Sequence, residues 1–463
     1  MTMGTVVPMA QGAEEVVVRF YNKETDLARV VDWERKCEAG PGGQVALLQD
    51  VLGDPLCRVR HFPAYSMLVA EIGTEVVGVI RAGIKVLVCG KKGVSAPSPV
   101  GRGLTSVDVP VYTRAGYILG LRVSAAHRRM GIGHKLAAKM EDWCKEQGAE
   151  YVYFATTKDN EASVKLFTKR LQYEPFRNPA ILIQPVFVHS RPAPAHVEFT
   201  KLSPEAAIAF YRARLGTQEF FPKDIDKVLD SKLCAGTWVA TLRDDDNHRQ
   251  GGGAGRFCCG GASCRVSEES VMGSIEESFA GCDKGMALPE SWAVLSLWKC
   301  NEIFKLEVKG VSLMKRSLAY MSRVAEKALP WFRIPSIPNL FTSFGMQFMF
   351  GLHAEGSRGD ELMTSLCWHA HNQSRELGCQ VLMTEVGAND PIKKCIPHWN
   401  MFSSDDDLFC VKRLEPTSAT CTGKDSRGEL QQHLRRSSEL NSSTDWSRAP
   451  AVPGSLFMDP RDV

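Results

Sequence analysis

The residues with the clearest chemical potential are Arg128, Gly131 and Gly133, which form the pattern Arg-x-x-Gly-x-Gly. Glycines at this spacing let several backbone N–H groups turn toward one point, and a helix that begins there adds partial positive charge. The side chains of Arg128 and Arg129, with Lys135 a little further on, offer ionic contacts to phosphate. The pattern therefore predicts a turn that binds a pyrophosphate. Glycine pairs are common before helices, so the flanking elements decide how specific the signal is.

The segments around this turn form a strand, turn, helix, strand and helix in succession. Residues 117–123 are a nearly continuous apolar run, typical of a buried central strand. After the turn, apolar side chains recur at helical spacing until Gly148, a residue that favours a helix end. Residues 149–156 predict another strand, and Asp159 or Asn160 begins a further helix. This context excludes a Rossmann site, which needs Gly-x-Gly-x-x-Gly, and a kinase-type phosphate loop, which needs Gly-Lys-Ser/Thr.

The same unit recurs in the second part of the chain. Leu352 lies 231 residues after Leu121 in a similar apolar run, and Gly378 lies 230 residues after Gly148, again at a predicted helix end. Residues 380–386 then predict a strand. Nearly constant offsets favour an internal duplication, although two unrelated α/β domains can share such patterns by chance. The predicted fold class is α/β, with a mixed α+β sheet in each repeat.

The duplication divides the chain into a first domain at residues 14–190 and a degenerate second domain at residues 196–415. Segments rich in Gly and polar residues at 90–113 and 244–287 predict one flexible insertion in each domain. Residues 416–463 are mostly polar and predict a mainly flexible C-terminal tail.

Some shorter segments also carry specific expectations. Residues 45–52 have a helical pattern that is ended by Gly-Asp-Pro. Strand patterns at 238–242, 292–298 and 304–308 resemble the paired strands that precede the first glycine turn. The apolar residues 455–458 are expected to dock on the body of the protein.

Composition bounds the class of protein. The chain has 463 residues, 44% of them hydrophobic, and a net charge of only +3, which excludes wholesale disorder and argues against bulk nucleic-acid binding. We find no secretory leader pattern and no apolar run long enough to span a membrane. The odd count of 15 cysteines favours reduced, intracellular thiols. Neither the cysteines of residues 244–287 nor His369 and His371 have metal-site spacing, so no metal is expected.

The strand, the Arg-x-x-Gly-x-Gly turn and the helices after it resemble the general N-acetyltransferase (GNAT) superfamily, whose signature is Gln/Arg-x-x-Gly-x-Gly/Ala. Outside the insertions and the tail, the chain is similar to the plant Hookless-type N-acetyltransferases. The segments that carry this similarity are Leu-Gly-Asp-Pro-Leu-Cys-Arg-Val-Arg-His at 52–61, Leu-Gly-Leu-Arg-Val-Ser at 119–124 with the turn, Glu-Phe-Phe-Pro-Lys-Asp-Ile-Asp at 219–226, Glu-Ser-Trp-Ala-Val-Leu-Ser at 290–296 and Ile-Pro-His-Trp at 396–399.

The resemblance implies that the first domain binds acetyl-CoA and passes its acetyl group directly to an amine. It implies that the pyrophosphate binds on the turn, the pantetheine arm binds beside the strand before it, and Asn160 lies near the pantetheine. The coenzyme-binding residues expected on this basis are Leu121, Arg122, Val123, Arg128, Arg129, Met130, Gly131, Ile132, Gly133, His134 and Asn160.

The expected catalytic groups are harder to find. Many family members have a Tyr as proton donor to the leaving thiolate, and that position here is Phe167. Residues 117–123 contain no carboxylate to act as a base, which leaves Glu71 and Tyr153 as candidates, while His127 is interpreted as a turn residue. Proximity alone supplies much of the rate of a direct transfer, so these departures are compatible with activity. The alternative is a non-catalytic CoA-binding or protein-interaction regulator with the same fold.

The second repeat lacks the glycine turn. Residues 354–361 read Ala-Glu-Gly-Ser-Arg-Gly-Asp-Glu, and their three acids would repel a pyrophosphate. We therefore predict that this half does not bind CoA and serves as a partner, substrate-selecting or dimerising module. By resemblance, the acceptor is a protein amine such as lysine, the protein acts in hormone-controlled plant growth, and it is nuclear or cytoplasmic. No sequence-specific nucleic-acid binding is expected.

Overall fold

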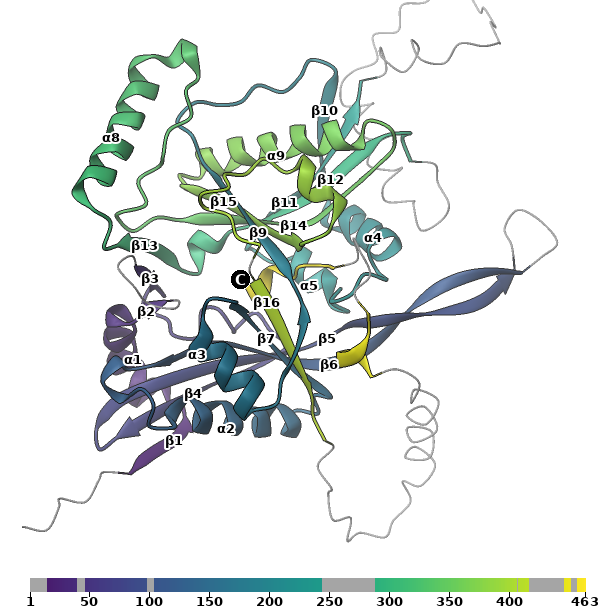
Figure 1. Cartoon of the computed structure of the whole chain (residues 1–463). Coiled ribbons are helices and arrows are strands. Elements are labelled where there is room, and N and C mark those ends of the chain that lie inside the picture. Colours follow the sequence, from purple (N-terminus) through teal and green to yellow (C-terminus); the bar gives the residue numbers. More distant parts are fainter. Residues whose placement is uncertain are drawn as a thin grey trace, which may run out of the picture.

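The computed structural model describes residues 15–39, 46–97, 104–243, 288–405, 407–415, 445–450 and 456–463. Two large mixed sheets are stacked on each other, with helix α2 (Ile132–Glu146) below the lower sheet and α9 (Gly359–Glu376) above the upper sheet in the view of Figure 1. Helices and sheets thus alternate as layers, and the α/β fold class with mixed sheets is confirmed.

The lower sheet belongs mainly to the first repeat. Its seven strands have the order β1 (Val16–Phe20), β4 (Ala64–Ile72), β5 (Glu75–Pro97), β6 (Leu104–Val123), β7 (Tyr151–Thr157), β16 (Asp407–Arg413) and β8 (Glu174–Arg177). The helices of this half are α1 (Lys23–Lys36), α2, and α3 (Glu161–Val164), which continues as the π-helical turn η2 (Lys165–Arg170).

The upper sheet belongs mainly to the second repeat. Its six strands have the order β10 (Val197–Leu202), β11 (Cys234–Leu242), β12 (Trp292–Trp298), β14 (Met346–Glu355), β15 (Val381–Gly387) and β9 (Pro179–Pro185). The helices of this half are α4 (Pro204–Arg214), α5 (Ile225–Leu229), α8 (Leu313–Ala328) and α9.

A small third sheet joins the two halves. It consists of β13 (Lys305–Lys309), β3 (Ala46–Asp50) and β2 (Glu38–Ala39). Two expectations were wrong here, because residues 45–52 form a strand instead of a helix and residues 304–308 leave the upper sheet to pair with it. Single turns of 3-10 helix occur at η1 (Ala125–His127), η4 (Cys300–Glu302), η5 (Pro330–Phe332), η6 (Pro391–Cys395), η7 (Trp446–Arg448) and η8 (Pro460–Asp462).

The two repeats share their central geometry. β6 pairs in parallel with β7 only as far as Ile118, and β14 pairs in parallel with β15 only as far as Met349. Just beyond these points, Gly120 and Gly351 have φ angles of 62° and 63°, values that a side chain disfavours. The strands therefore separate at the same place in both halves, as an internal duplication requires.

The halves exchange strands, so the predicted boundaries 14–190 and 196–415 do not separate the two sheets. β16, from the end of the second repeat, lies in the lower sheet and pairs with β7 from Asp407 opposite Thr157 to Arg413 opposite Tyr151. β9 follows β8 of the lower sheet after a single residue, crosses to the upper sheet and pairs with β15. Each sheet is completed by a strand from the other half.

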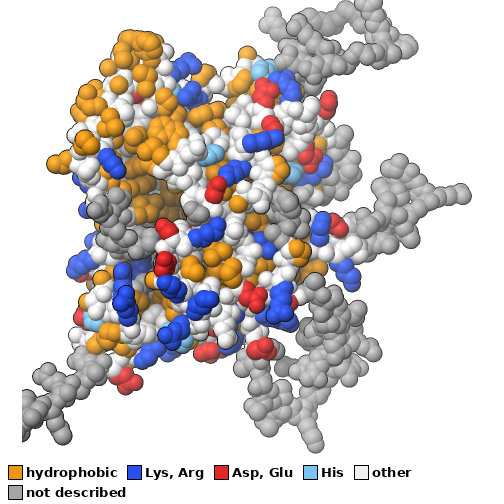
Figure 2. All heavy atoms as spheres, in the orientation of Figure 1, with side chains coloured by type: hydrophobic (Ala, Val, Ile, Leu, Met, Phe, Trp, Pro, Cys, Tyr) orange, Lys and Arg blue, Asp and Glu red, His pale blue; other side chains and the backbone are white. Residues whose placement is uncertain are grey.

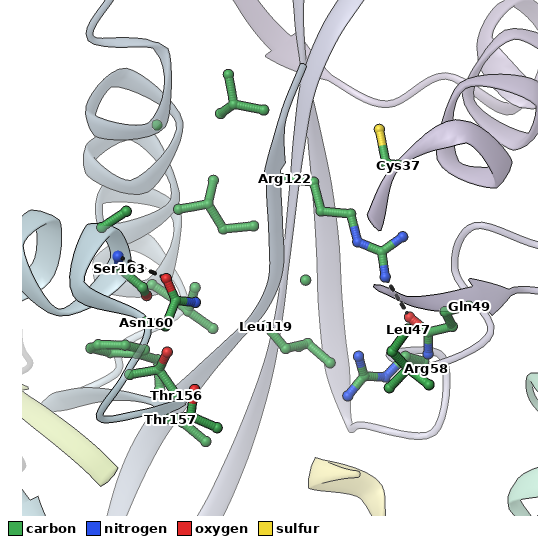
Figure 3. Close-up of a pocket in the computed structure, with 18 of the residues that line it drawn as sticks. Cys37, Leu47, Gln49, Arg58, Leu119, Arg122, Thr156, Thr157, Asn160 and Ser163 are labelled. Carbon is green, nitrogen blue, oxygen red and sulfur yellow. Dashed lines mark hydrogen bonds between the residues drawn. The ribbon is translucent and has the colours of Figure 1, made fainter. Parts of the chain in front are cut away.

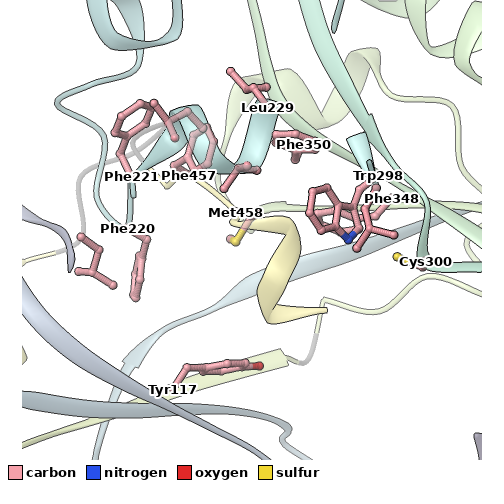
Figure 4. Packing of buried hydrophobic residues seen from close by; sticks show 14 of the residues in the cluster. Tyr117, Phe220, Phe221, Leu229, Trp298, Cys300, Phe348, Phe350, Phe457 and Met458 are labelled. Carbon is pink, nitrogen blue, oxygen red and sulfur yellow. The ribbon is translucent and has the colours of Figure 1, made fainter. Parts of the chain in front are cut away.

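Four cores of buried residues hold the described layers together. One lies between the lower sheet and α2, a second lies between the upper sheet and α9, and the third fills the space between the two sheets, while a small fourth core packs α1 against β4 and β5. Figure 4 shows the third core, where Tyr117 of the lower sheet and Phe348 of the upper sheet lie on either side of the segment that carries Phe457 and Met458. The halves therefore share one interior.

Two short segments of the C-terminal tail pack on the body of the protein. Residues 445–450 and 456–463 pack on the body, as expected for residues 456–458, while 416–444 and 451–455 lie outside the described residues. Trp446 is buried and its Nε1 donates to Glu219 Oε1 at 2.7 Å. Buried Asp459 and Arg461 also bond each other within this segment.

The insertion predicted at 90–113 is mostly regular structure. β5 and β6 continue pairing out to Pro97 opposite Leu104, so a long two-stranded ribbon extends from the lower sheet in Figure 1. The expectation of a flexible loop was wrong because Gly, Ser and Pro at the end of a ribbon have the composition of a loop. The predicted insertion at 244–287 lies outside the described residues.

Candidate functional site

A large cleft opens where β6 and β7 separate. It has a volume of about 2140 Å³ and is bounded by the glycine turn, the ends of β6 and β7, and the facing strands of the upper half. Figure 2 shows a hollow between the two halves, with apolar side chains on its upper wall. That wall includes Leu306, Leu340 and Phe344 of the second repeat.

The glycine turn has the backbone that a phosphate cradle needs. Arg129 and Gly131 have φ angles of 65° and 80°, in the left-handed region, and Gly131 immediately precedes α2. Alternation of left-handed and ordinary conformations points successive N–H groups to one side. The space around Gly131 is open, whereas a Cβ on Gly133 would lie only 3.3 Å from Leu166 Cδ2.

The end of β6 presents a free edge beside this turn. Beyond Ile118 it no longer pairs with β7, so its backbone groups face the cleft. Arg122 points away to the other wall, where its guanidinium donates to Gln49 Oε1 at 2.7 Å, as Figure 3 shows. An extended ligand with amide groups could therefore pair with residues 119–123.

Asn160 lies on the opposite side of the cleft from Arg122 (Figure 3). Its side-chain oxygen accepts from the backbone N–H of Ser163 at 3.3 Å, which caps α3 and fixes the amide. The same contact therefore also fixes the direction of the Asn160 side-chain nitrogen. Among the coenzyme-binding residues expected from the sequence, all line the cleft except Met130, whose side chain is 52% exposed.

The two catalytic candidates named from the sequence do not line the cleft. Glu71 accepts from Arg19 Nε at 2.8 Å and from Arg29 at 2.7 Å; burial alone would raise its pKa, but these hydrogen bonds outweigh that effect and lower it. Tyr153 is buried and donates to Asp462 Oδ2 at 2.8 Å, and burial raises its pKa well above the usual range. Phe167 lines the cleft and offers no proton.

Ionisable groups that sequence reasoning missed also line the cleft. They are Glu385 on β15, Asp407 on β16, Asp462 near the C-terminus, and Arg58. They come from four separate parts of the chain, and only Arg58 belongs to a segment singled out in the sequence, 52–61, where nothing marked it as a site residue. The only signal is the alternation of β15, whose residues Val381, Met383 and Glu385 share one face.

The corresponding turn of the second repeat is filled with protein. A Cβ on Gly356 would lie 2.2 Å from the backbone oxygen of Glu290, and the N–H of Arg358 donates to Ser291 Oγ at 3.3 Å. The acids of this turn have partners, since Asp360 lies 2.8 Å from Lys394 and Glu361 contacts Arg358 and His196. Steric filling, in addition to charge, closes this turn to a ligand.

Neither a metal site nor a membrane-spanning helix is found in the described part of the chain. No group of three or more His, Cys, Asp or Glu side chains there could hold a metal ion. No helix there is long and apolar enough to cross a membrane. His369 and His371 contact aromatic rings of the upper half instead of each other.

Sequence comparison agrees with this site. Residues 28–173 match the Acetyltransferase (GNAT) family. The chain is 44% identical over 452 residues to "Probable N-acetyltransferase HLS1" of Arabidopsis thaliana, which covers 96% of this chain and 99% of the relative. The chain therefore belongs to the GNAT acetyltransferase family and is an acetyltransferase.

Within that family, the resemblance to the plant Hookless-type proteins is confirmed over nearly the whole chain. A further relative, "Acetyl transferase GW6a" of Oryza sativa subsp. japonica, is 32% identical over 489 residues, with coverage of 96% of this chain and 97% of the relative. Among solved structures, a tandem GNAT protein from the clavulanic acid biosynthesis pathway aligns with a TM-score of 0.40 and 10% identity, over 87% of this chain and 100% of that one.

Proposed function

We propose that this protein transfers the acetyl group of acetyl-CoA to an amine on a protein, with lysine as the acceptor. The observation that carries the proposal is the open glycine turn beside the free edge of β6, both of which face one cleft. The turn supplies converging N–H groups for a pyrophosphate, and the edge supplies amide groups for a pantetheine arm.

In this proposal, the coenzyme's pyrophosphate binds the backbone of residues 129–134, with Arg128 and Arg129 adding charge. The pantetheine arm lies along residues 121–123, and the amide of Asn160 donates a hydrogen bond to it. This arrangement directs the thioester toward the interior of the cleft, between the two sheets.

The same cleft offers room for the acceptor. Its upper wall is apolar and comes from the second repeat, which fits the hydrocarbon stem of a lysine better than a small polar amine. Holding amine and thioester together supplies a large part of the rate of a direct transfer. The absence of a hydroxyl at Phe167 is then compatible with catalysis, because the thiolate can take its proton from the attacking amine.

The biological setting proposed here rests on the family resemblance alone. By that resemblance, the protein regulates hormone-controlled growth in a plant and acts in the nucleus or the cytoplasm. A growth role is consistent with a protein acceptor, since acetylation removes the charge of a lysine side chain.

Titration calorimetry with acetyl-CoA tests the proposal. The wild-type protein should bind one equivalent per chain, and Gly131→Glu/Gly133→Glu should abolish binding, because a carboxylate would replace the open space at the turn. Gly90→Ala is the matched control, since a Cβ there has no neighbour within 4 Å.

A second measurement separates enzyme from regulator. When lysine peptides are incubated with acetyl-CoA, mass spectrometry should show acetylated product with the wild-type protein and none with Gly131→Glu/Gly133→Glu. Binding without transfer to any amine would favour the non-catalytic regulator, which is supported by the missing hydroxyl at Phe167 and by the lack of a carboxylate in residues 117–123. No binding by the wild type would contradict the proposal.

A further inference from the structure

The face of β15 that looks into the cleft carries one acid. Alternate residues of this strand point to opposite sides, so Leu382 and Val386 pack in the core beside α9, whereas Val381, Met383 and Glu385 line the cleft. Glu385 follows the last residue of β15 that pairs with β14. It therefore lies where the strands of the second repeat separate, facing the active half.

The position of Glu385 is informative because of the duplication. Its counterpart 230 residues earlier is Ala155 on β7, which also lines the cleft but has no ionisable group. Each repeat thus directs one residue from its strand separation into the common space. The first repeat supplies the coenzyme turn without a carboxylate, and the second supplies a carboxylate without an open turn.

The carboxylate of Glu385 is available for a ligand. No hydrogen bond or ion pair to it is found among the described residues, although Arg58 lines the same cleft. By contrast, Asp462 is engaged by Lys85 Nζ at 2.7 Å and by the hydroxyl of Tyr153 at 2.8 Å. Glu385 is half-buried at the wall of this cleft. An acid that is partly removed from water and has no partner is costly, and such groups are concentrated at functional sites.

We propose that Glu385, contributed by the second repeat, is the general base that removes the proton from the acceptor ammonium group. The proposal rests on the proposed function, acetyl transfer to a lysine amine. It makes the second repeat part of the active site instead of a separate regulatory module.

The electrostatic surroundings suit this role. Burial, as the largest cause, and the charges of Asp407 on β16 and Asp462 near the C-terminus together raise the pKa of Glu385 to about 8, against the opposing effect of Arg58. The phenol of Tyr117 on β6 also interacts with it, and burial holds the pKa of Tyr117 well above the usual range. A base is most effective when its pKa lies near the working pH.

The proposed reaction forms one C–N bond and breaks one C–S bond. The ionised Glu385 takes one proton from the ammonium group, and the neutral amine attacks the thioester carbonyl to form a C–N bond. The tetrahedral intermediate collapses with cleavage of the C–S bond, and the thiolate leaves with the electron pair. The second proton of the attacking nitrogen passes to the thiolate to give CoA-SH, and Glu385 later releases its proton to water.

The test compares Glu385→Gln with wild type in acetyl transfer to a lysine peptide. We expect the rate at saturating acetyl-CoA to fall about 100-fold or more, the usual contribution of a general base, while acetyl-CoA affinity changes less than about twofold. Glu302→Gln is the matched control, because this exposed acid of the same half pairs with Lys299 outside the cleft. It should leave the rate unchanged.

The pH profile supplies a readout that a purely structural residue would not change. The wild-type rate should rise as Glu385 ionises, with a midpoint near the pKa of about 8, and this inflection should be missing in Glu385→Gln. Glu385→Asp keeps a carboxylate and should retain the inflection at a lower rate. Thermal unfolding checks that each variant is folded.

Several outcomes would overturn the inference. Suppose that the wild type is active and Glu385→Gln keeps a rate within about threefold of it, or keeps the same pH profile. Another group is then the base. Loss of acetyl-CoA binding in Glu385→Gln would make the residue structural. If the wild type itself binds no acetyl-CoA, the proposed function fails, and that result is distinguishable because it is seen before any variant is made.

Discussion

The glycine turn of the first repeat and its counterpart in the second repeat begin from the same geometry. In both, a parallel strand pair separates just before a left-handed glycine, Gly120 or Gly351. The first turn then continues through open space at Gly131, whereas the second is filled by the backbone of Glu290 and the side chain of Ser291. The second repeat has thus kept the strand separation and lost the open glycine turn.

This difference changes how the second repeat should be understood. Its acids are neutralised by Lys394, Arg358 and His196, so repulsion of phosphate is only part of the reason that the turn is closed. The repeat has kept the strands that face the first half and completes the cleft with them. One copy holds the open glycine turn, and the other forms the opposite wall.

The largest predicted effect comes from a substitution in β16, the strand that the second repeat contributes to the lower sheet. Phe409 of β16 is buried in the lower sheet against Tyr153 and Phe220, with ring centroids at 6.2 and 5.7 Å. Phe409→Ala should lower the free energy of unfolding by about 3–5 kcal/mol, the usual cost of emptying such a site. Urea unfolding should show one transition for both halves.

The control for this variant lies on the same strand. Arg413 is exposed at the end of β16, so Arg413→Ala should change the free energy of unfolding by less than about 0.5 kcal/mol. Two separate unfolding transitions in Phe409→Ala would show that the halves are independent domains.

Helices α9 and α2 carry histidines that differ in burial. In α9, burial lowers the pKa of His369 and of His371 to about 4, whereas His134 of α2 is exposed. Because the unfolded chain binds these protons at a higher pH, stability should fall as the pH drops from 6.5 toward 4, by about 3 kcal/mol for buried His371.

Urea unfolding at pH 7 and pH 4.5 measures this effect. His369→Phe removes one titrating ring that packs on Phe199 and Trp238, and it should make the acid dependence shallower. An identical loss of stability in the wild type and in His369→Phe would refute the assignment.

A side chain added at the start of α2 should weaken coenzyme binding, whereas one added at the start of α9 should not. Gly133→Val would press on Leu166 and on Val123, whose atoms lie 3.3 and 3.8 Å from a Cβ there, and should weaken acetyl-CoA binding by about 30-fold, or 2 kcal/mol. Gly359→Ala meets Ala354 at 3.4 Å, an ordinary contact, and should leave binding unchanged. Equal losses in calorimetry would contradict the comparison.

The smallest effect is expected from removing the acids of the second turn. Asp360→Asn/Glu361→Gln breaks exposed ion pairs, which should change the free energy of unfolding by less than about 1 kcal/mol. Because the turn stays filled, the stoichiometry of acetyl-CoA should remain one per chain. A second equivalent bound by this variant would show that charge alone closes the turn.

The sequence predicted best what is local. The pattern Arg-x-x-Gly-x-Gly, the helix periodicity after it and the helix ends at Gly148 and Gly378 each depend on residues close together in the sequence, and the structure has them as expected. The prediction of a helix at residues 45–52 was wrong because a short apolar run fits a helix or a strand equally well. The ribbon at 90–113 went wrong because its composition is that of a loop.

The rest depends on contacts between distant segments. Glu385, Asp462 and Arg58 meet in one cleft only because the two sheets stack and the tail returns. The exchange of β9 and β16 leaves no trace in the sequence, since an apolar strand has the same alternation in either sheet. A local sequence motif therefore cannot reveal the proposed base, because Glu385 lies on a different repeat from the glycine turn.

The position of β16 also has a consequence for synthesis. Asp407 pairs with Thr157, so the lower sheet remains open between β7 and β8 until 250 further residues have been translated. At ordinary rates of translation this takes about 10 to 50 seconds, during which two unpaired strand edges are exposed on the ribosome. The nascent chain should therefore depend on chaperones until its last strand closes the sheet.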